Sequence, residues 1–172
     1  MIAGVPSRPL LLALMIASGA ATGCAGATAE GTGSQEPPVV LELTDVSGRH
    51  FGVQDFRGKP LLLFVFATYD SASQIAMLTL ERFATQNRDV AVIGVAAQPQ
   101  AARLLPLHRD TLNIRIPLAY DEHEVLISGH SALGPVEVIP NYVLLDAAGR
   151  IRARHAGPLD QPRLEQLVAS VR

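Results

Sequence analysis

The stretch that decides the fold is LLLFVFATYDSAS, residues 61–73. Residues 61–67 form a continuous apolar run with two aromatic side chains, which is typical of a strand buried on both faces of a sheet. Asp70 follows this run and is a favourable helix N-cap, so we expect a helix at about 71–86. A buried strand that leads directly into a helix indicates an α/β fold.

Further strands and helices alternate along the chain. Apolar or β-branched runs predict strands at 39–43, 89–97, 116–120, 142–145 and 151–155, the last two joined by a hairpin turn at 146–149. Helices are expected at 99–108, with a break at Pro106, and after Asp160, which caps the last one; residues 121–133 are expected to be partly helical. This order predicts a central sheet covered by helices on both faces.

Three stretches, in this order, resemble the TlpA-type branch of the thioredoxin-like superfamily. DFRGKPLLLF at 55–64 resembles the family's approach to its central strand, and FATYDSAS at 66–73 overlays the segment with its two redox cysteines. VIPNYVLLDAAGRI at 138–151 resembles the segment whose proline is cis and faces the active site. The resemblance implies an α/β thioredoxin-like fold, with a central mixed β-sheet flanked by helices on both faces.

The chain departs from the family at the redox positions, where it has Asp70 and Ser73. Cys24 is its single cysteine, and both thiol–disulfide exchange and peroxide reduction need a cysteine thiolate, so neither chemistry is available within residues 25–172. Copper binding by a cysteine pair fails for the same reason. We interpret Asp70 as a helix cap in place of a nucleophile. Asp70 acting as a general base on Ser73 stays open as an alternative, as does a role not yet assigned.

The proline segment keeps a binding role even without thiols. The resemblance implies that Pro140 is cis and that the loop before it pairs with an extended client segment through backbone hydrogen bonds. We therefore expect Tyr69, Ile139 and Pro140 to border a peptide groove beside Asp70, with no catalytic residue and no cofactor. The leading hypothesis is a non-catalytic binding or scaffold module; the alternatives are the oxidoreductase or antioxidant that the family label implies, or an atypical enzyme.

The N-terminus predicts export. The apolar run at 10–16 is too short to span a membrane but suits a secretory signal, and it ends in ATGC at 21–24, which resembles a bacterial lipobox. We expect a signal peptide at 1–23, a lipidated Cys24 with a flexible tether at 24–38, and the folded domain at 39–172. This places the protein in the bacterial cell envelope, anchored to a membrane through Cys24 and with an envelope protein as its partner; the alternative is an ordinary leader that removes Cys24.

Charge and histidine spacing bear on two further classes of site. The formal net charge is −2 and no basic block occurs, so we expect no nucleic-acid partner. His123 and His130 lie near acidic residues, which raises a metal site as an alternative. The usual zinc spacings are absent, so we expect a solvated loop and no metal.

Arg150, Arg152 and Arg154 alternate along a predicted strand and should share one of its faces. We interpret this as protection of a sheet edge against pairing. A docking patch for an acidic partner or anionic headgroups is the alternative.

Overall fold

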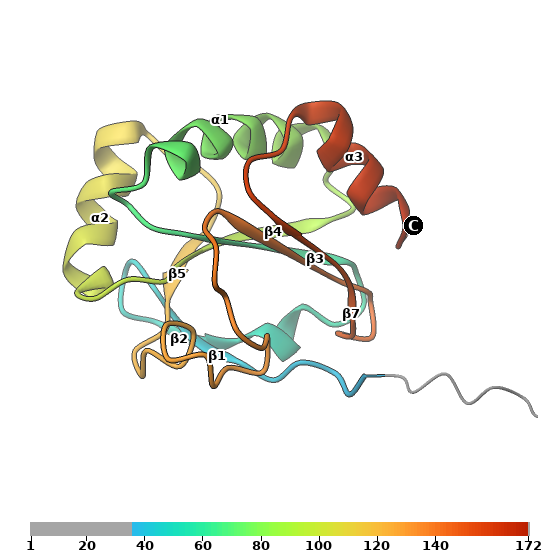
Figure 1. The fold of residues 1–172 in the computed structure, drawn as a ribbon, viewed down its shortest axis with the longest axis horizontal. Coiled ribbons are helices and arrows are strands. Elements are labelled where there is room, and N and C mark those ends of the chain that lie inside the picture. Colours follow the sequence, from blue (N-terminus) through green and yellow to red (C-terminus); the bar gives the residue numbers. More distant parts are fainter. Residues whose placement is uncertain (1–35, 172) are drawn as a thin grey trace, which may run out of the picture. The chain divides into compact units, whose positions relative to one another are not determined.

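The computed structural model describes residues 36–171. The expected signal peptide, Cys24 and most of the tether lie outside the described residues. Within them, seven strands form one mixed sheet with the order β2-β1-β5-β4-β3-β6-β7 (Figure 1). The expected α/β fold around a central mixed sheet is confirmed.

The elements follow one another in a simple order. The strands are β1 (Glu42–Asp45), β2 (His50–Gly52), β3 (Leu61–Phe66), β4 (Ala91–Ala96), β5 (Leu118–Tyr120), β6 (Asn141–Leu145) and β7 (Ile151–Ala156). The helices are the 3-10 helix η1 (Val53–Phe56) and the α-helices α1 (Ser71–Gln86), α2 (Ala101–Leu112) and α3 (Gln161–Ala169).

Strand β3 lies in the middle of the sheet, and all six of its side chains are buried. It pairs in parallel with β4, from Leu61 opposite Ala91 to Phe66 opposite Ala96, and antiparallel with β6 on its other side. Because side chains alternate along a strand, β3 contributes to both hydrophobic clusters of the domain. This is why its sequence is apolar without interruption.

The two faces of the sheet are covered differently. All three α-helices pack into one cluster, around Phe64 and Phe66 of β3, and Figure 1 shows them on one side of the sheet. The other cluster contains η1 and the segment 121–139, through Val53, Leu126 and Leu133. The expected helices on both faces therefore need a correction, since the second face carries one 3-10 helix and no α-helix among the described residues.

The expected helix within 121–133 is wrong, and the reason is local. The buried carboxylate of Asp121 accepts hydrogen bonds from the backbone N–H groups of His123 (3.0 Å) and Leu126 (2.9 Å), which closes a turn. Glu124 has φ 53° and Gly129 has φ 75°, and a right-handed helix cannot contain either conformation. The segment is a series of turns.

The other boundaries differ by small shifts. Helix α1 has the expected bounds, whereas β1 begins three residues later than expected and β2 was not expected at all. Helix α2 begins at Ala101 because Gln100 has the left-handed φ of 60°, and it continues through Pro106. The carbonyl group that Pro106 leaves without a donor belongs to the exposed Ala102, where solvent can reach it. No helix in the described part of the chain is long and apolar enough to cross a membrane.

Candidate functional site

The candidate site begins where β3 ends and α1 starts. After Phe66 the chain turns, with the Asp70 N–H donating to the Ala67 carbonyl at 3.2 Å. Asp70 is the N-cap of α1, and its Oδ2 accepts from the Ser73 N–H at 2.7 Å. The expected helix cap is confirmed. A carboxylate at this position satisfies a free N–H group of the first turn and interacts favourably with the positive end of the helix dipole.

Ser73 is 1% exposed, and its Oγ has no hydrogen-bond partner in the part of the chain that the structure describes. The Asp70 carboxylate therefore binds the Ser73 backbone and not its hydroxyl. A general base has to contact the proton that it removes, and the nucleophile has to reach a substrate. The geometry of these two side chains provides neither condition.

Two glutamines hold the loop between β3 and α1. The Thr68 N–H donates to Oε1 of Gln98 at 2.5 Å, and the Thr68 carbonyl accepts from Nε2 of Gln74 at 3.0 Å. Gln98 is 3% exposed, and its Nε2 has no hydrogen-bond partner within residues 36–171. Neither glutamine was predicted from the sequence to belong to the site. Gln98 follows β4, and the carboxyl ends of two parallel neighbours lie at the same edge of a sheet, so this position was open to prediction.

The proline segment reaches the same edge from the other side of β3. The Ile139–Pro140 peptide bond is cis, as the resemblance implied. Asn141 pairs with Val65 in an antiparallel register, so Pro140 and Ile139 lie beside the residues that follow Val65. The Pro140 carbonyl accepts from the Gly157 N–H at 2.8 Å. Tyr69, Ile139 and Pro140 are thus brought to one end of the sheet.

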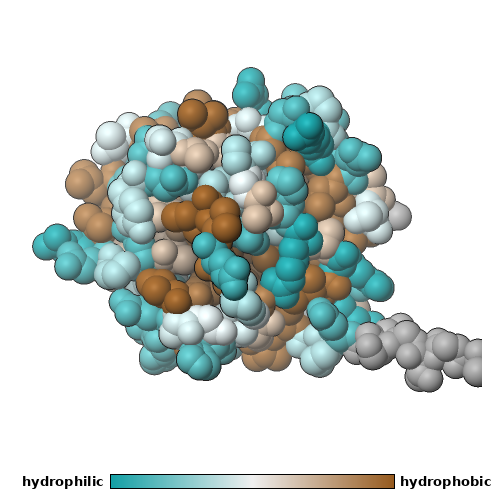
Figure 2. All heavy atoms as spheres, in the orientation of Figure 1, coloured by the Kyte–Doolittle hydropathy of each residue, from teal (hydrophilic) through white to brown (hydrophobic). Residues whose placement is uncertain are grey.

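This end of the sheet presents apolar side chains to solvent. Tyr69 is 73% exposed and Val138 is 50% exposed, whereas Pro140 is buried and Ile139 half-buried. Figure 2 shows one face of the molecule, on which hydrophobic side chains form several patches separated by hydrophilic ones. We define the groove surface as Tyr69, Val138, Ile139 and Pro140.

The backbone next to the proline is also open. Within the described residues, the backbone groups of Val138 and Ile139 make no hydrogen bond to the rest of the chain. Unpaired N–H and C=O groups at the end of a strand can bind an extended peptide in the manner of an added strand. The surface therefore combines apolar contacts with free backbone donors and acceptors.

The histidines singled out in the sequence lie elsewhere. His123 and His130 belong to the turn segment 121–139, and the described residues contain no group of three or more side chains suited to hold a metal ion. His108 of α2 packs against Phe66 with ring centroids 5.8 Å apart, and burial lowers its pKa.

The three arginines of the C-terminal hairpin lie on or next to β7, which is an edge strand. Arg152 and Arg154 are exposed, and Nε of Arg152 forms an ion pair with Oδ2 of Asp146 at 2.8 Å. This placement agrees with the interpretation that the charges protect a sheet edge.

Comparison with known proteins places this geometry in context. Residues 31–169 match the Redoxin family model. The thioredoxin-like protein YneN of Bacillus subtilis (strain 168) is 25% identical over 137 residues, which cover 78% of this chain and 76% of YneN.

Two solved structures illustrate the similarity of the fold. The exposed lipoprotein thioredoxin Etrx1 of Streptococcus pneumoniae has a TM-score of 0.64 at 18% identity, over 76% of this chain and 98% of that one. A thiol-disulfide isomerase from Corynebacterium glutamicum has a TM-score of 0.63 at 22% identity, over 79% and 96%. Both share the thioredoxin-like α/β fold with this chain.

Proposed function

The chain belongs to the Redoxin family, and we propose that it is a non-catalytic member that binds an extended peptide of an envelope protein at the groove surface. The observation that carries the proposal is the pair at the redox positions. Asp70 is held as a helix cap by the Ser73 N–H at 2.7 Å, and Ser73 is buried.

The absence of cysteine from residues 25–172 removes the nucleophile that thiol–disulfide exchange requires. The scaffold around the lost nucleophile is nevertheless complete. The loop is fixed by Gln98 and Gln74, and the cis proline lies next to the end of β3. A site with its binding parts intact and its reactive group replaced supports binding without turnover.

The mode of binding follows from the groove surface. The free backbone groups of Val138 and Ile139 pair with an extended segment, while Tyr69 and Val138 contact its apolar side chains. Aromatic side chains such as Tyr69 contribute large contact areas at low entropic cost, and they are often the residues that dominate binding energy. The partner is therefore an extended, apolar peptide segment.

The proposal includes a location in the cell envelope. The lipobox-like segment before Cys24 predicts a lipid anchor, and two acyl chains or more suffice for stable attachment to a membrane. The fold neighbour Etrx1 is itself an exposed lipoprotein. The tether then holds the domain near the membrane surface, where other envelope proteins present their segments. Loss of membrane attachment in Cys24→Ser, measured by fractionation, tests this part alone.

The main test uses site-specific photocrosslinking in cells that express the full chain. A photoreactive residue replaces Val138 in one variant and Leu112, at the far end of α2, in the other; the two side chains are 50% and 42% exposed. We expect a discrete protein adduct at 138 that Tyr69→Ala weakens, and no such adduct at 112. Equal adducts at both positions contradict the groove, and insulin reduction above background by the purified chain contradicts the loss of catalysis.

A further inference from the structure

A cleft of about 560 Å³ opens at the end of the sheet opposite Asp70. It lies where β1 and β5 separate, since their pairing extends only over Thr44–Tyr120 and Asp45–Ala119. Strand β5 is parallel to β4 and β3, so its start marks the edge away from the groove surface. The volume is in the range of about 300–1,000 Å³ that is usual for small-molecule sites.

The floor of the cleft is apolar. Six hydrophobic side chains that are buried or half-buried line it: Val46, Phe51, Phe56, Ile114, Ile116 and Leu118. The rings of Phe51 and Phe56 meet edge to face with centroids 5.9 Å apart. These side chains belong to both hydrophobic clusters of the domain, so the cleft is an opening into the core at the end of the sheet. An apolar chain fits such a floor.

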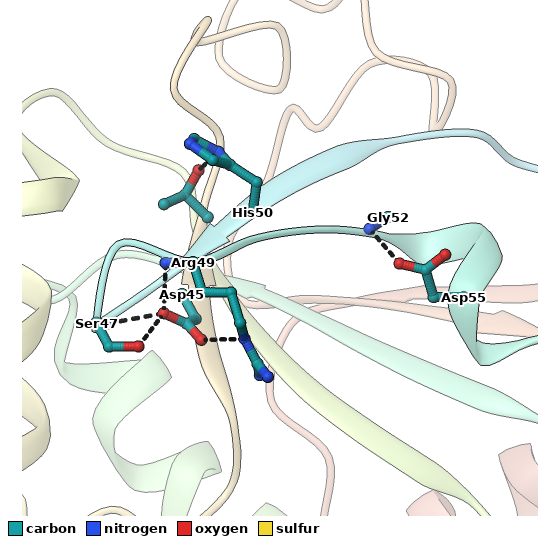
Figure 3. A network of polar contacts seen from close by, with 7 residues as sticks. Asp45, Ser47, Arg49, His50, Gly52 and Asp55 are labelled. Carbon is teal, nitrogen blue, oxygen red and sulfur yellow. Dashed lines mark hydrogen bonds and ion pairs between the residues drawn. The ribbon is translucent and has the colours of Figure 1, made fainter.

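The two carboxylates that line the cleft already accept hydrogen bonds from neighbouring residues of the chain. Asp45 accepts from the N–H groups of Ser47 (2.8 Å) and Arg49 (3.0 Å), from the Ser47 hydroxyl (2.6 Å) and from Arg49 Nε (3.1 Å), as Figure 3 shows. Asp55 accepts from the Gly52 N–H at 2.8 Å (Figure 3). Neither carboxylate needs a cationic ligand.

The backbone donors along one wall are occupied as well. Oε1 of Glu81 accepts from the N–H groups of Arg115 and Ile116, each at 2.8 Å, and the Arg109 carbonyl accepts from the Ile114 N–H at 3.0 Å. Glu81 reaches this wall from α1 and does not line the cleft. On this wall, the donors that remain for a ligand are therefore on side chains.

Three arginines line the cleft, and their side chains are not equivalent. Arg49 pairs with Asp45, and Arg109 pairs with Asp110 at 2.8 Å. The guanidinium of Arg115 makes no hydrogen bond or ion pair with any residue that the structure describes. The cleft thus combines an apolar floor with one unpaired cation, and a guanidinium can bind a carboxylate through two parallel hydrogen bonds.

We propose that this cleft binds a free fatty acid, with its carboxylate on Arg115 and its alkyl chain on the apolar floor. The ligand class follows from complementarity: one unpaired positive charge takes one negative charge, and the floor takes an unbranched apolar chain. The proposal is independent of the peptide-binding function, because the cleft and the groove surface lie at opposite ends of the sheet.

The test is calorimetric titration of the full chain with decanoate, below the concentration at which decanoate forms micelles. The chain carries Cys24→Ser so that no attached lipid competes for the cleft. We expect one bound decanoate per chain, and we expect Arg115→Gln to raise the Kd by about tenfold through the loss of a charge-assisted pair. Arg103→Gln, an exposed arginine of α2 outside the cleft, is the matched control and should leave the Kd unchanged.

Methyl NMR gives the position of the ligand and does not depend on the variants. Decanoate should shift the methyl signals of Ile114, Ile116 and Leu118, and the uncharged decanamide should bind more weakly. Equal binding of decanamide, shifts confined to the groove surface, or no binding to the folded chain would each overturn the proposal. So would tighter binding of a capped acidic peptide, which would assign the cleft to a protein partner.

Discussion

Two aspartates close turns at opposite ends of the sheet, and their surroundings differ. In the β1–β2 turn, Asp45 accepts four hydrogen bonds from Ser47 and Arg49. At the start of α1, Asp70 accepts one side-chain hydrogen bond, from the Ser73 N–H. Two buried atoms near this second turn, Ser73 Oγ and Gln98 Nε2, have no hydrogen-bond partner among the described residues.

This difference in hydrogen bonding distinguishes Asp45, a structural carboxylate, from Asp70, a carboxylate at the candidate functional site. Buried polar groups are normally paired, because an unpaired one loses its hydration without compensation. The polar groups around Asp45 serve the turn completely. Around Asp70, the turn leaves the Ser73 hydroxyl and the Gln98 amide nitrogen unused. These groups lie where the family resemblance places reactive groups.

The largest effect should come from restoring the dithiol. The double variant Asp70→Cys/Ser73→Cys should raise insulin reduction from background to at least about tenfold above it, because a thiol at a helix N-terminus is ionised more readily. Asp70→Cys alone has no resolving thiol and serves as the control. If the folded double variant forms its disulfide and still shows no turnover, more than the two side chains separates this site from an active one.

Asp45→Ala should give the largest loss of stability. Removal of a carboxylate with four hydrogen bonds should lower the free energy of unfolding by about 2 kcal/mol at pH 7, measured by urea denaturation. The hydrogen bonds from Ser47 and Arg49 lower the pKa of Asp45 to about 2.

The same pKa predicts how this loss depends on pH. A lowered carboxylate pKa stabilises the fold above the ordinary value of 3.8, and this contribution disappears as the pH falls toward 2. The stability difference between the original chain and Asp45→Ala should therefore shrink between pH 4 and pH 2. A difference that stays constant over this range would show that the ionised carboxylate is not the source of the effect.

Asp70 should matter less for stability than Asp45. Asp70→Ala removes one N-cap hydrogen bond and should cost about 1 kcal/mol, whereas Asp70→Asn keeps a good cap and should cost only a few tenths. Thermal unfolding of the two variants beside Asp45→Ala measures the order. If Asp70→Ala were the more destabilising of the two alanine variants, the contrast between the two turns would be wrong.

Much of the fold could be predicted because the signals are local. The apolar run of β3 and the cap at Asp70 define a strand and a helix without reference to the rest of the chain, and the bounds of α1 agree with expectation. Strand β2 has three residues, too few for an alternating pattern. The turns at 121–139 depend on a buried Asp121 whose contacts reach five residues along the chain, and composition alone favours a helix there.

Only part of the candidate site could be predicted from the sequence. Asp70, Ser73 and Pro140 follow from aligned motifs, and the structure brings Tyr69, Ile139 and Pro140 to the end of the sheet where α1 begins. The cleft was not foreseen, because its walls come from the β1–β2 hairpin and from residues 109–118, segments far apart in the sequence that the pairing of β1 with β5 brings together. Contacts between such distant segments depend on the strand order of the sheet, which local sequence patterns do not give.

The smallest effect tests the contrast most directly. Ser73→Ala removes a buried hydroxyl that has no partner among residues 36–171, so the variant should lose no hydrogen bond and avoid the cost of burying a polar group. Alanine also has a higher helix propensity than serine. We expect the free energy of unfolding to rise by about 0.5 kcal/mol.

Ser71→Ala, at an exposed position one residue after the cap, is the matched control for helix propensity. If Ser73→Ala is less stable than the original chain while Ser71→Ala is not, then the Ser73 hydroxyl has a partner in solution, and the turn at Asp70 is as fully paired as the one at Asp45.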